Sequence, residues 1–337
     1  TNNLVIDKNG SISYQKLLEN SKKIGSGLGK FVKNNDPVPV YMEKGISALE
    51  VFMGALYSGG FYSLLNVGLP KMRLEQIINV LDVDYIVTDN EHLDDAKVFF
   101  PDKELILYED LIKEEINDDL LNEIRKKKID LDPVYANFTS GSTGVPKGVI
   151  VGNRSIIDFV DNFVDTFGIK DDDVIANQAP FDFDVSVKDI YPALKTGATL
   201  VIVPKELFSK PALLIDFLVD HKVTTMTWAV SALCLISTFH GLDYKVPTSV
   251  KRVMFSGEVM PMKHLKSWME HLPNAMFVNL YGPTEITCNC TYFPIERQYE
   301  DSEKIPAGKA FPGRRVILVD EEGKQVTEPG VQGEICS

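Results

Sequence analysis

Short apolar runs alternate with amphipathic stretches along most of the chain. Runs such as Val38–Met42 and Phe61–Leu65 have the length and composition of buried strands. The stretches between them, for example Ile46–Tyr57 and Met262–Glu270, have the length and apolar spacing of helices that pack on a sheet. Strands that alternate with helices predict parallel sheets covered on both faces. We therefore expect an α/β fold, in which two doubly wound, mostly parallel sheets and their helices form a layered αβαβα core.

The pattern changes near residue 291, beyond which strand and turn signals follow one another without helices. With 337 residues, the chain is long enough for two or three units of about 150 residues each. We predict a first α/β unit over 38–170, a second that combines 1–37 with 171–290, and the start of a small β-barrel over 291–337. The sequence lacks an initiator methionine and stops in a strand-like pattern, so we expect it to be part of a longer protein.

The charge balance narrows the classes of partner. The chain carries 48 acidic and 35 basic residues, a formal net charge of −13. This balance disfavours nucleic acid and anionic membrane surfaces as partners, because both need clustered Lys and Arg. No apolar run approaches the roughly 20 residues that span a bilayer, so we expect no membrane insertion. The four cysteines form no Cys-x-x-Cys pair and no signal peptide is visible, which predicts a reducing, cytoplasmic setting.

A segment rich in glycine and hydroxyl residues lies between two predicted strands at 139–148. Its glycines let the backbone approach a ligand and expose successive N–H groups, which form an anion-binding concavity. It differs from the P-loop of nucleotide triphosphatases, because Pro146 precedes the lysine and a strand follows instead of a helix. A flexible linker is the plainer interpretation. The predicted phosphate site consists of Thr139, Ser140, Gly141, Ser142, Thr143, Gly144 and Lys147.

A second polar segment runs from Asn279 to Glu285. It offers an amide for a base edge, an aromatic face, a Gly-Pro turn, a hydroxyl and a carboxylate. A carboxylate beside a phosphate loop suits Mg²⁺, although such a loop taken alone is more often structural. Ligands of open parallel sheets bind beyond the carboxyl ends of the strands. Polar, glycine-bearing loops follow the predicted strands that end at Phe138, Phe255 and Asn279, so we expect the ligand site there.

Together with four shorter segments, the two loops resemble the motifs of a known family, in order along the chain. The shorter segments are Ile12–Leu18, Gly54–Phe61, Phe183–Ser186 and Gly333–Ile335. The chain is similar over essentially its whole length to the adenylate-forming superfamily, which comprises acyl-CoA synthetases, luciferases and the adenylation domains of nonribosomal peptide synthetases.

The resemblance implies a role for each matching residue. The loop Thr139–Lys147 is expected to close over the phosphates of ATP. Asn279 and Tyr281 are expected to bind and stack on adenine, with Gly257 and Glu258 as the opposite wall. Gly282 is expected to approach the nucleotide, Thr284 to contact the α-phosphate and Glu285 to hold Mg²⁺. The catalytic residues implied in this way are Thr139, Lys147, Thr284 and Glu285.

Asp184 indicates which branch of the family the chain resembles. In amino-acid-activating members an Asp at this place pairs with the α-ammonium of the substrate, which fatty-acid activators do not need. A helix-capping role near Ser186 is the alternative. The segments Asn177–Phe181 and Asp189–Pro192 resemble D-alanine–carrier-protein ligases, although Ser256 stands where a cysteine is expected. The substrate pocket implied by the resemblance comprises Asp184, Val185, Lys188, Thr227, Met254, Ser256, Leu280, Cys288 and Asn289.

Lys188 occupies a pocket position that is usually apolar or aromatic in the family. A lysine there favours a substrate with a side-chain carboxylate such as glutamate, whereas the ligase resemblance favours alanine. Alternatively, Lys188 extends out of its helix to solvent or pairs with a local acid.

The implied reaction is attack of an amino acid carboxylate on the α-phosphorus of ATP, which releases pyrophosphate and forms the aminoacyl-adenylate. Positioning and charge stabilisation account for most of the catalysis. Relatives then transfer the acyl group to the phosphopantetheine thiol of a peptidyl or acyl carrier protein. Their C-terminal lid and ribose-binding Asp would follow Ser337, so we expect this chain to turn over poorly. Two alternatives remain open. One is a CoA ligase of fatty or aryl acids, which differs from an amino acid activator mainly at Asp184. The other is a catalytically incomplete nucleotide-binding module.

Overall fold

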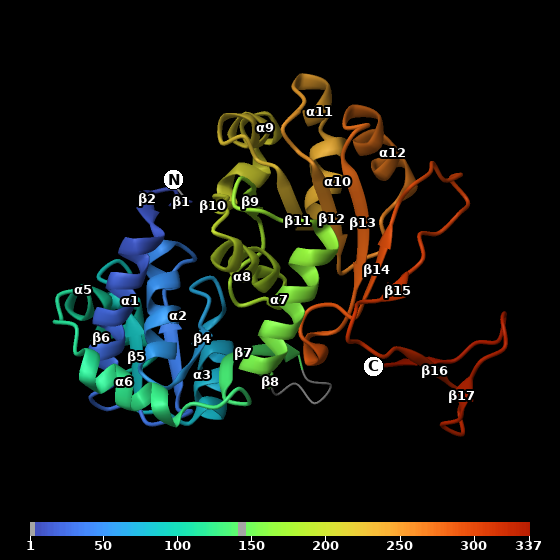
Figure 1. Cartoon of the computed structure of the whole chain (residues 1–337). Helices are drawn as coiled ribbons and strands as arrows, with labels where there is room; N and C mark the ends of the chain where they lie inside the picture. The colour runs from blue at the N-terminus through green and yellow to red at the C-terminus, as the bar shows by residue number, and fades with distance from the viewer. Residues whose placement is uncertain (1–3, 141–145) are drawn as a thin grey trace.

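The computed structural model describes residues 4–140 and 146–337. Figure 1 shows two large sheets with helices between and outside them, and a small third sheet that extends away from both. The first sheet has six strands in the order β6-β5-β3-β4-β7-β8, parallel except for the β7–β8 hairpin. Its strands are β3 (Pro37–Tyr41), β4 (Phe61–Leu64), β5 (Tyr85–Thr88), β6 (Glu104–Leu107), β7 (Pro133–Ser140) and β8 (Pro146–Gly152).

The second sheet has nine strands in the order β15-β14-β13-β12-β11-β9-β10-β1-β2, antiparallel only at its two ends. They are β1 (Leu4–Asp7), β2 (Gly10–Ser13), β9 (Val174–Asn177), β10 (Thr199–Ile202), β11 (Thr225–Ala229), β12 (Arg252–Ser256), β13 (Met276–Tyr281), β14 (Thr291–Pro294) and β15 (Lys309–Ala310). The third sheet is an open antiparallel one of β16 (Ile317–Val319), β17 (Gln325–Val326) and β18 (Glu334–Cys336).

Helices lie in layers on both faces of the two large sheets. The first unit carries α1 (Tyr14–Leu28), α2 (Ile46–Tyr57), α3 (Lys71–Leu81), α4 (Leu93–Phe99), α5 (Tyr108–Leu111) and α6 (Asp118–Lys127). The remainder are α7 (Asn153–Phe167), η1 (Asp184–Ser186), α8 (Val187–Thr196), η2 (Lys205–Ser209), α9 (Pro211–Asp220), α10 (Val230–Thr238), α11 (Gly241–Tyr244), α12 (Met262–His271) and η3 (Thr284–Ile286), where η marks a 3₁₀ helix.

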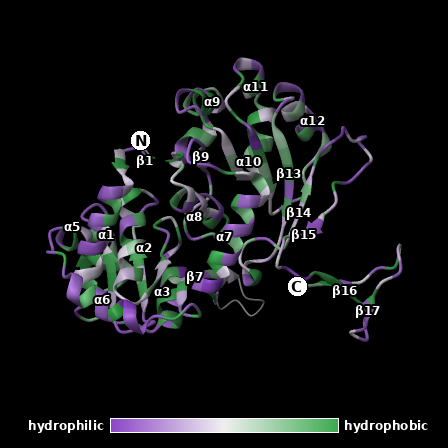
Figure 2. Ribbon diagram, in the orientation of Figure 1, coloured by the Kyte–Doolittle hydropathy of each residue, from purple (hydrophilic) through white to green (hydrophobic). Residues whose placement is uncertain are grey.

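Three apolar clusters hold these layers together. The largest joins both sheets through α1, α2, α7 and α8. A second covers the opposite face of the nine-stranded sheet with α9, α10 and α12, and a third packs α3 and α4 on the opposite face of the six-stranded sheet. Figure 2 shows apolar residues along the strands and hydrophilic residues over outer helices such as α6. The predicted layered α/β core of two mostly parallel sheets is therefore confirmed.

The small β unit differs in extent from the prediction. β14 and β15 extend the nine-stranded sheet, because the chain turns back after β13 and β14 pairs antiparallel with it. The third sheet begins only at Ile317. Residues 1–37 are also divided, since β1 and β2 join the second sheet while α1 packs against α2. Gly25 allows that packing, because a Cβ there would lie 2.5 Å from the Cβ of Tyr57.

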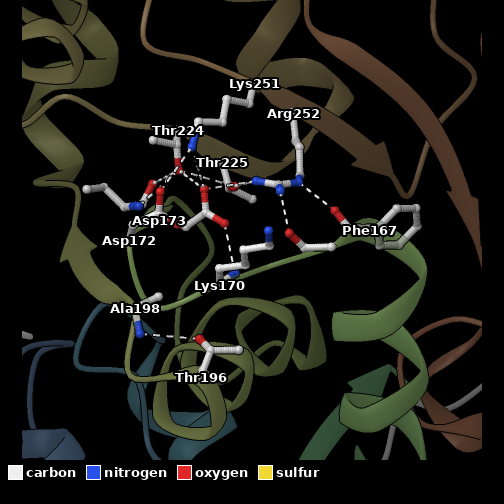
Figure 3. A network of polar contacts seen from close by, with 12 residues as sticks. Phe167, Lys170, Asp172, Asp173, Thr196, Ala198, Thr224, Thr225, Lys251 and Arg252 are labelled. Atoms are coloured by element: carbon white, nitrogen blue, oxygen red, sulfur yellow. Dashed lines mark hydrogen bonds and ion pairs between the residues drawn. The ribbon is translucent and has the colours of Figure 1, made fainter.

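A buried arginine fixes the amino ends of the central strands (Figure 3). Arg252, at the start of β12, donates to Oδ1 of Asp173 at 3.0 Å and to the backbone oxygens of Phe167 and Gly168 at 2.7 and 2.6 Å. Burial raises the pKa of Asp173, but the N–H of Lys170, the Thr224 hydroxyl and Arg252 outweigh it, so this pKa lies below its usual value. The end of α7 is thereby tied to β9 and β12, at the sheet edge opposite the carboxyl ends.

Within the described part of the chain, no helix has the length and apolar character needed to cross a bilayer.

Candidate functional site

The residues of the predicted substrate pocket lie between one face of the nine-stranded sheet and the helices η1 and α8. Alternate side chains of a strand share a face, and Thr227 pairs in register with Met254, which places them side by side. Ser256 lies further along the same face, and Leu280 follows on β13. All four side chains are buried. The sheet thus brings together four of the predicted substrate residues.

Asp184 begins η1 and is 9% exposed. Burial raises the pKa of its carboxyl, while the charge of Lys188 and the hydroxyl of Thr284 act against this rise. Cys288 lies beneath it and donates from Sγ to the backbone oxygen of Asp184 at 3.1 Å. Val185, the next residue of η1, is half-buried. A carboxylate in such a site is stabilised in its charged form by a cation bound beside it.

Lys188 is fully buried, and its side chain points toward the end of β12 and the turn at Asn289. Its Nζ donates to Oγ of Ser256 at 3.0 Å and to Oδ1 of Asn289 at 2.9 Å. The alternative in which this side chain extends to solvent is therefore wrong, since 1% of the residue is exposed. Burial lowers the pKa of its ammonium, and the nearby Cys288, Asp184 and Asp189 act in the opposite direction.

The segment after β13 folds back tightly onto the pocket. The N–H of Cys290 donates to the backbone oxygen of Tyr281 at 2.9 Å. A Cβ at Gly282 would lie 2.5 Å from the Cα of Asn289, so only glycine fits there. Thr287 and Cys288 have φ values of 64° and 67°, which L residues adopt at a cost of order 1–3 kcal/mol. This strained turn delivers Cys288 and Asn289 to the pocket. The four cysteines are free thiols, and Cys288 and Cys290 lie in this turn, not on a strand.

The predicted adenine-binding residues emerge side by side at the carboxyl ends of β12 and β13. Phe255 pairs with Asn279 in parallel register, so the loop of Gly257 and Glu258 leaves the sheet beside Tyr281. Gly257 has φ +93° and open space where a side chain would stand. Glu258 and the ring of Tyr281 are exposed. The amide nitrogen of Asn279 donates to the backbone oxygen of Pro306 at 2.9 Å, which leaves its oxygen for a ligand.

The β7–β8 hairpin brings Thr139 opposite Lys147. Lys147 is exposed, and β8 lies against η3, which carries a half-buried Thr284 and an exposed Glu285. Sequence reasoning missed Arg73, whose Nη2 donates to the backbone oxygen of Thr139 at 3.1 Å. Ser140 ends β7, and the remaining predicted phosphate residues, Gly141, Ser142, Thr143 and Gly144, lie outside the described residues.

The donor set suits a magnesium ion that arrives with a nucleotide. Over residues 4–140 and 146–337, no group of three or more His, Cys, Asp or Glu residues is arranged to hold a metal ion. Mg²⁺ commonly binds one or two carboxylates together with substrate phosphates and waters, and the exposed carboxylate of Glu285 beside the hairpin fits that pattern.

A buried polar chain behind the pocket was also missed. Lys44 donates to Oδ1 of Asn177 at 3.2 Å and to the backbone oxygen of Gln178 at 2.9 Å. Asn177 donates in turn to Oδ2 of Asp189 at 2.9 Å. Burial lowers the pKa of Lys44 to about 8 and raises the pKa of Asp189 to about 7. Oδ1 of Asp189 and Oγ1 of Thr227 have no hydrogen-bond partner in the described structure. Asn177 and Asp189 lie in segments that the sequence analysis had noted, but no sequence signal linked them to each other or to Lys44, because only the packing of α8 on β9 brings them together.

A cavity of about 680 Å³ opens between the two large sheets, at the carboxyl ends of β3, β4, β9 and β10. Met42, Leu64, Phe181 and Ile202 are among its apolar lining residues, and Lys44 lies in its wall. None of the predicted site residues lines it.

Known proteins resemble this chain over most of its length. A family model described as "AMP-binding enzyme" matches residues 2–337. The D-alanine--D-alanyl carrier protein ligase of Bacillus velezensis is 31% identical over 335 residues, which cover 96% of this chain and 64% of that protein. The ligase of the same name from Staphylococcus epidermidis is 31% identical over 322 residues, covering 95% of this chain and 64% of that protein. The chain thus spans a little under two thirds of the length of these relatives.

Solved structures share the fold. The nonribosomal peptide synthetase FmoA3, bound to alpha-methyl-L-serine-AMP, has a TM-score of 0.85 at 23% identity and covers 94% of this chain and 35% of its own. The N-terminal subdomain of Klebsiella oxytoca NpsA, in complex with 3-hydroxybenzoyl-AMSN, has a TM-score of 0.81 at 19% identity, covering 98% of this chain and 81% of its own. The structure of IdnL1 has a TM-score of 0.81 at 25% identity, and the match covers 97% of this chain and 66% of the IdnL1 chain.

Proposed function

Because this chain belongs to the AMP-binding enzyme family, we propose that it is the core of an ATP-dependent ligase that activates an amino acid. In the proposed step, a carboxylate oxygen of the amino acid bonds to the α-phosphorus of ATP, and the bond from that phosphorus to the bridging oxygen of pyrophosphate breaks. The products are aminoacyl-AMP and pyrophosphate. A phosphopantetheine thiol on a peptidyl or acyl carrier protein would then take the aminoacyl group and release AMP. We place this reaction in the cytoplasm.

The observation that carries this proposal is the buried carboxylate of Asp184 at the head of the pocket. Among the described residues, no Lys, Arg or His side chain lies within 4.0 Å of its oxygens. An α-ammonium bound there would supply a charge-assisted hydrogen bond. A fatty or aryl acid has no such group, and its binding would leave Asp184 buried without a cation.

The nucleotide would lie along the carboxyl ends of β12 and β13. The open space at Gly257 and the exposed ring of Tyr281 would hold adenine between them. Thr284 would contact the α-phosphate, Glu285 would share Mg²⁺ with the phosphates, and Lys147 would meet them from the hairpin. Catalysis would then rest on alignment of the carboxylate with the phosphorus and on neutralisation of charge.

Two side-chain classes are proposed for the substrate. The relatives from Bacillus velezensis and Staphylococcus epidermidis are named as ligases of D-alanine, which supports a small side chain. The buried ammonium of Lys188 supports an acidic one such as glutamate.

The test is binding of non-hydrolysable aminoacyl-adenylate mimics to this chain, with AMP and an acyl mimic that lacks the amine for comparison. Ligand at 100 times its Kd adds about 2.7 kcal/mol to stability, which thermal unfolding detects. Hydrogen bonds to charged groups contribute about 1.5–3 kcal/mol, so Asp184→Asn is expected to weaken amine-bearing mimics roughly 10-fold to 100-fold and leave AMP unchanged.

Asp182→Asn provides the matched control, because Asp182 is a nearby half-buried carboxylate that accepts from Asn66 at 3.0 Å. The Asp182→Asn variant is expected to bind amine-bearing mimics more tightly than the amine-free mimic, as the unaltered chain does. If the amine-free mimic binds as tightly as the others to the unaltered chain, the amino acid proposal is wrong and a CoA ligase of fatty or aryl acids takes its place.

A further inference from the structure

We infer that Lys44 is a positioning residue, which holds the segment 177–183 and thereby sets the place of the Asp184 carboxylate. This inference rests on the proposed function, since it takes Asp184 as the partner of the substrate α-ammonium. It goes further by assigning a part in amino acid selection to a loop of the six-stranded sheet.

The first step is that the chain leaves the sheet before it reaches Asp184. β9 ends at Asn177, whose backbone oxygen still accepts from the N–H of Val203 at 3.0 Å. Residues 178–183 form neither helix nor strand, and η1 begins only at Asp184. The polar groups of such a backbone need partners outside the regular ladders. The position of the Asp184 side chain therefore depends on what holds this segment.

The second step is that one ammonium meets three consecutive residues of the segment. Lys44, in the loop after β3, donates from Nζ to Oδ1 of Asn177 at 3.2 Å. It also donates to the backbone oxygens of Gln178 and Ala179 at 2.9 and 3.4 Å. An ammonium has three N–H donors, so the donors match these oxygens in number, and hydrogen bonds from a charged donor are the stronger kind. Lys44 thus holds the chain where the pairing of β9 with its neighbours stops.

The third step is that these contacts reach both sides of Asp184 along the chain. The amide nitrogen of Asn177 donates to Oδ2 of Asp189, so the side chain that Lys44 holds is also tied to α8. α8 begins directly after η1. Asp184 therefore lies between two stretches that are anchored through the same ammonium.

The fourth step separates Lys44 from the ligand itself. Lys44 lies in the wall of the cavity of about 680 Å³, and none of the predicted site residues lines that cavity. Its three donors face oxygens of the protein, so its effect on a substrate passes through Asp184. Water in the cavity can hydrogen-bond the oxygens that a change at Lys44 would expose, so we expect such a change to be compatible with folding.

The experiment compares three ligands by calorimetry. They are a non-hydrolysable alanyl-adenylate mimic, the propionyl mimic that differs only in lacking the amine, and AMP. The ratio of the affinities for the alanyl and propionyl mimics measures the preference for the amine, and AMP reports on the nucleotide site alone.

Lys44→Met removes the ammonium and keeps much of the volume. Because a hydrogen bond to Asp184 weakens when its distance and angle change, this variant is expected to lower the ratio about three- to tenfold and to leave AMP affinity unchanged. Lys44→Arg keeps the charge and the donors, and it is expected to restore most of the ratio.

Lys128→Met is the matched control for a purely structural effect. Lys128 is also a half-buried lysine of the first unit, and it donates to Oδ1 of Asn35 at 3.0 Å and to the backbone oxygen of Gly59 at 2.8 Å. These partners precede β3 and β4, at the edge of the sheet opposite Lys44. Both methionine variants are expected to lose stability in urea, but only Lys44→Met is expected to lose preference for the amine.

The outcomes separate this inference from the proposed function. An unchanged ratio in Lys44→Met, an equal loss in Lys128→Met, or no recovery in Lys44→Arg overturns the role of Lys44 and leaves amino acid activation standing. If the alanyl mimic does not exceed the propionyl mimic on the unaltered chain, the proposed function fails and this inference falls with it. Should Lys44→Met not fold, the shorter, neutral Lys44→Gln takes its place; it is expected to lower the ratio, and an unchanged ratio overturns the inference.

Discussion

Replacement of Arg252 by methionine tests how the central strands are anchored. The guanidinium donates to Asp173, to Oγ1 of Thr225 at 3.1 Å and to the backbone oxygens of Phe167 and Gly168 at the end of α7. Its side chain is 11% exposed and that of Asp173 is 1% exposed. The change therefore leaves a buried carboxylate and two backbone acceptors without this partner.

The expected loss follows from what remains around Asp173. Removing one member of a buried ion pair costs about 3–5 kcal/mol, because the other charge stays buried. Asp173 keeps its hydrogen bonds from the Thr224 hydroxyl and the N–H of Lys170, and Lys251 lies 3.5 Å away. These groups place the expected loss near the lower end, about 3 kcal/mol in the free energy of unfolding, measured by urea denaturation.

A surface pair on the same chain gives the control. Arg154 donates through two nitrogens to one oxygen of Asp130, but the two side chains are 65% and 51% exposed. Arg154→Met is expected to cost about 0–1 kcal/mol. Adding Asp173→Asn to Arg252→Met should recover part of the loss, because the stranded charge is gone. A cost for Arg252→Met no greater than that for Arg154→Met would refute the reasoning.

Two further predictions concern the same anchor and the pocket turn. Because the folded pKa of Asp173 is lowered, its ionisation stabilises the fold above its ordinary pKa of about 3.9, and this contribution disappears as pH falls through the lower folded value. The difference in unfolding free energy between the unaltered chain and Asp173→Asn should therefore be constant from about pH 7 to 5 and shrink below about pH 4; a difference that grows in acid would contradict the assignment. Gly282→Ala places a Cβ 2.5 Å from the Cα of Asn289. We therefore expect this variant to lose about 1–3 kcal/mol in the free energy of unfolding and to bind adenylate mimics more weakly. Gly323→Ala is the control for binding, because a Cβ there meets no atom within 4 Å, and it should leave the affinity for the mimics intact.

The sequence predicted the architecture well because periodicity is a local property. Runs such as Val38–Met42 and Ile46–Tyr57 show strand and helix patterns within a few residues, and both elements form with nearly those bounds. The pairing of β14 with β13 was not predictable in this way. It depends on the backbone turn at 282–290, which has no periodic signal, so the boundary near residue 291 was misplaced.

The candidate site shows the same division. Glycine, hydroxyl and carboxylate residues at Thr139–Lys147 and Asn279–Glu285 predict nucleotide chemistry through their resemblance to a known family, and a model of that family matches residues 2–337. Whether Lys188 reaches solvent or the pocket could not be read from the chain, since a lysine on an amphipathic helix suits either. Only the packing of α8 against β12 and the turn at Asn289 decided it, because partners 68 and 101 residues away close around its ammonium. The sequence by itself determined the layers, through patterns that each segment carries alone. The tertiary structure alone decided which charges are buried together, because burial depends on contacts between distant segments.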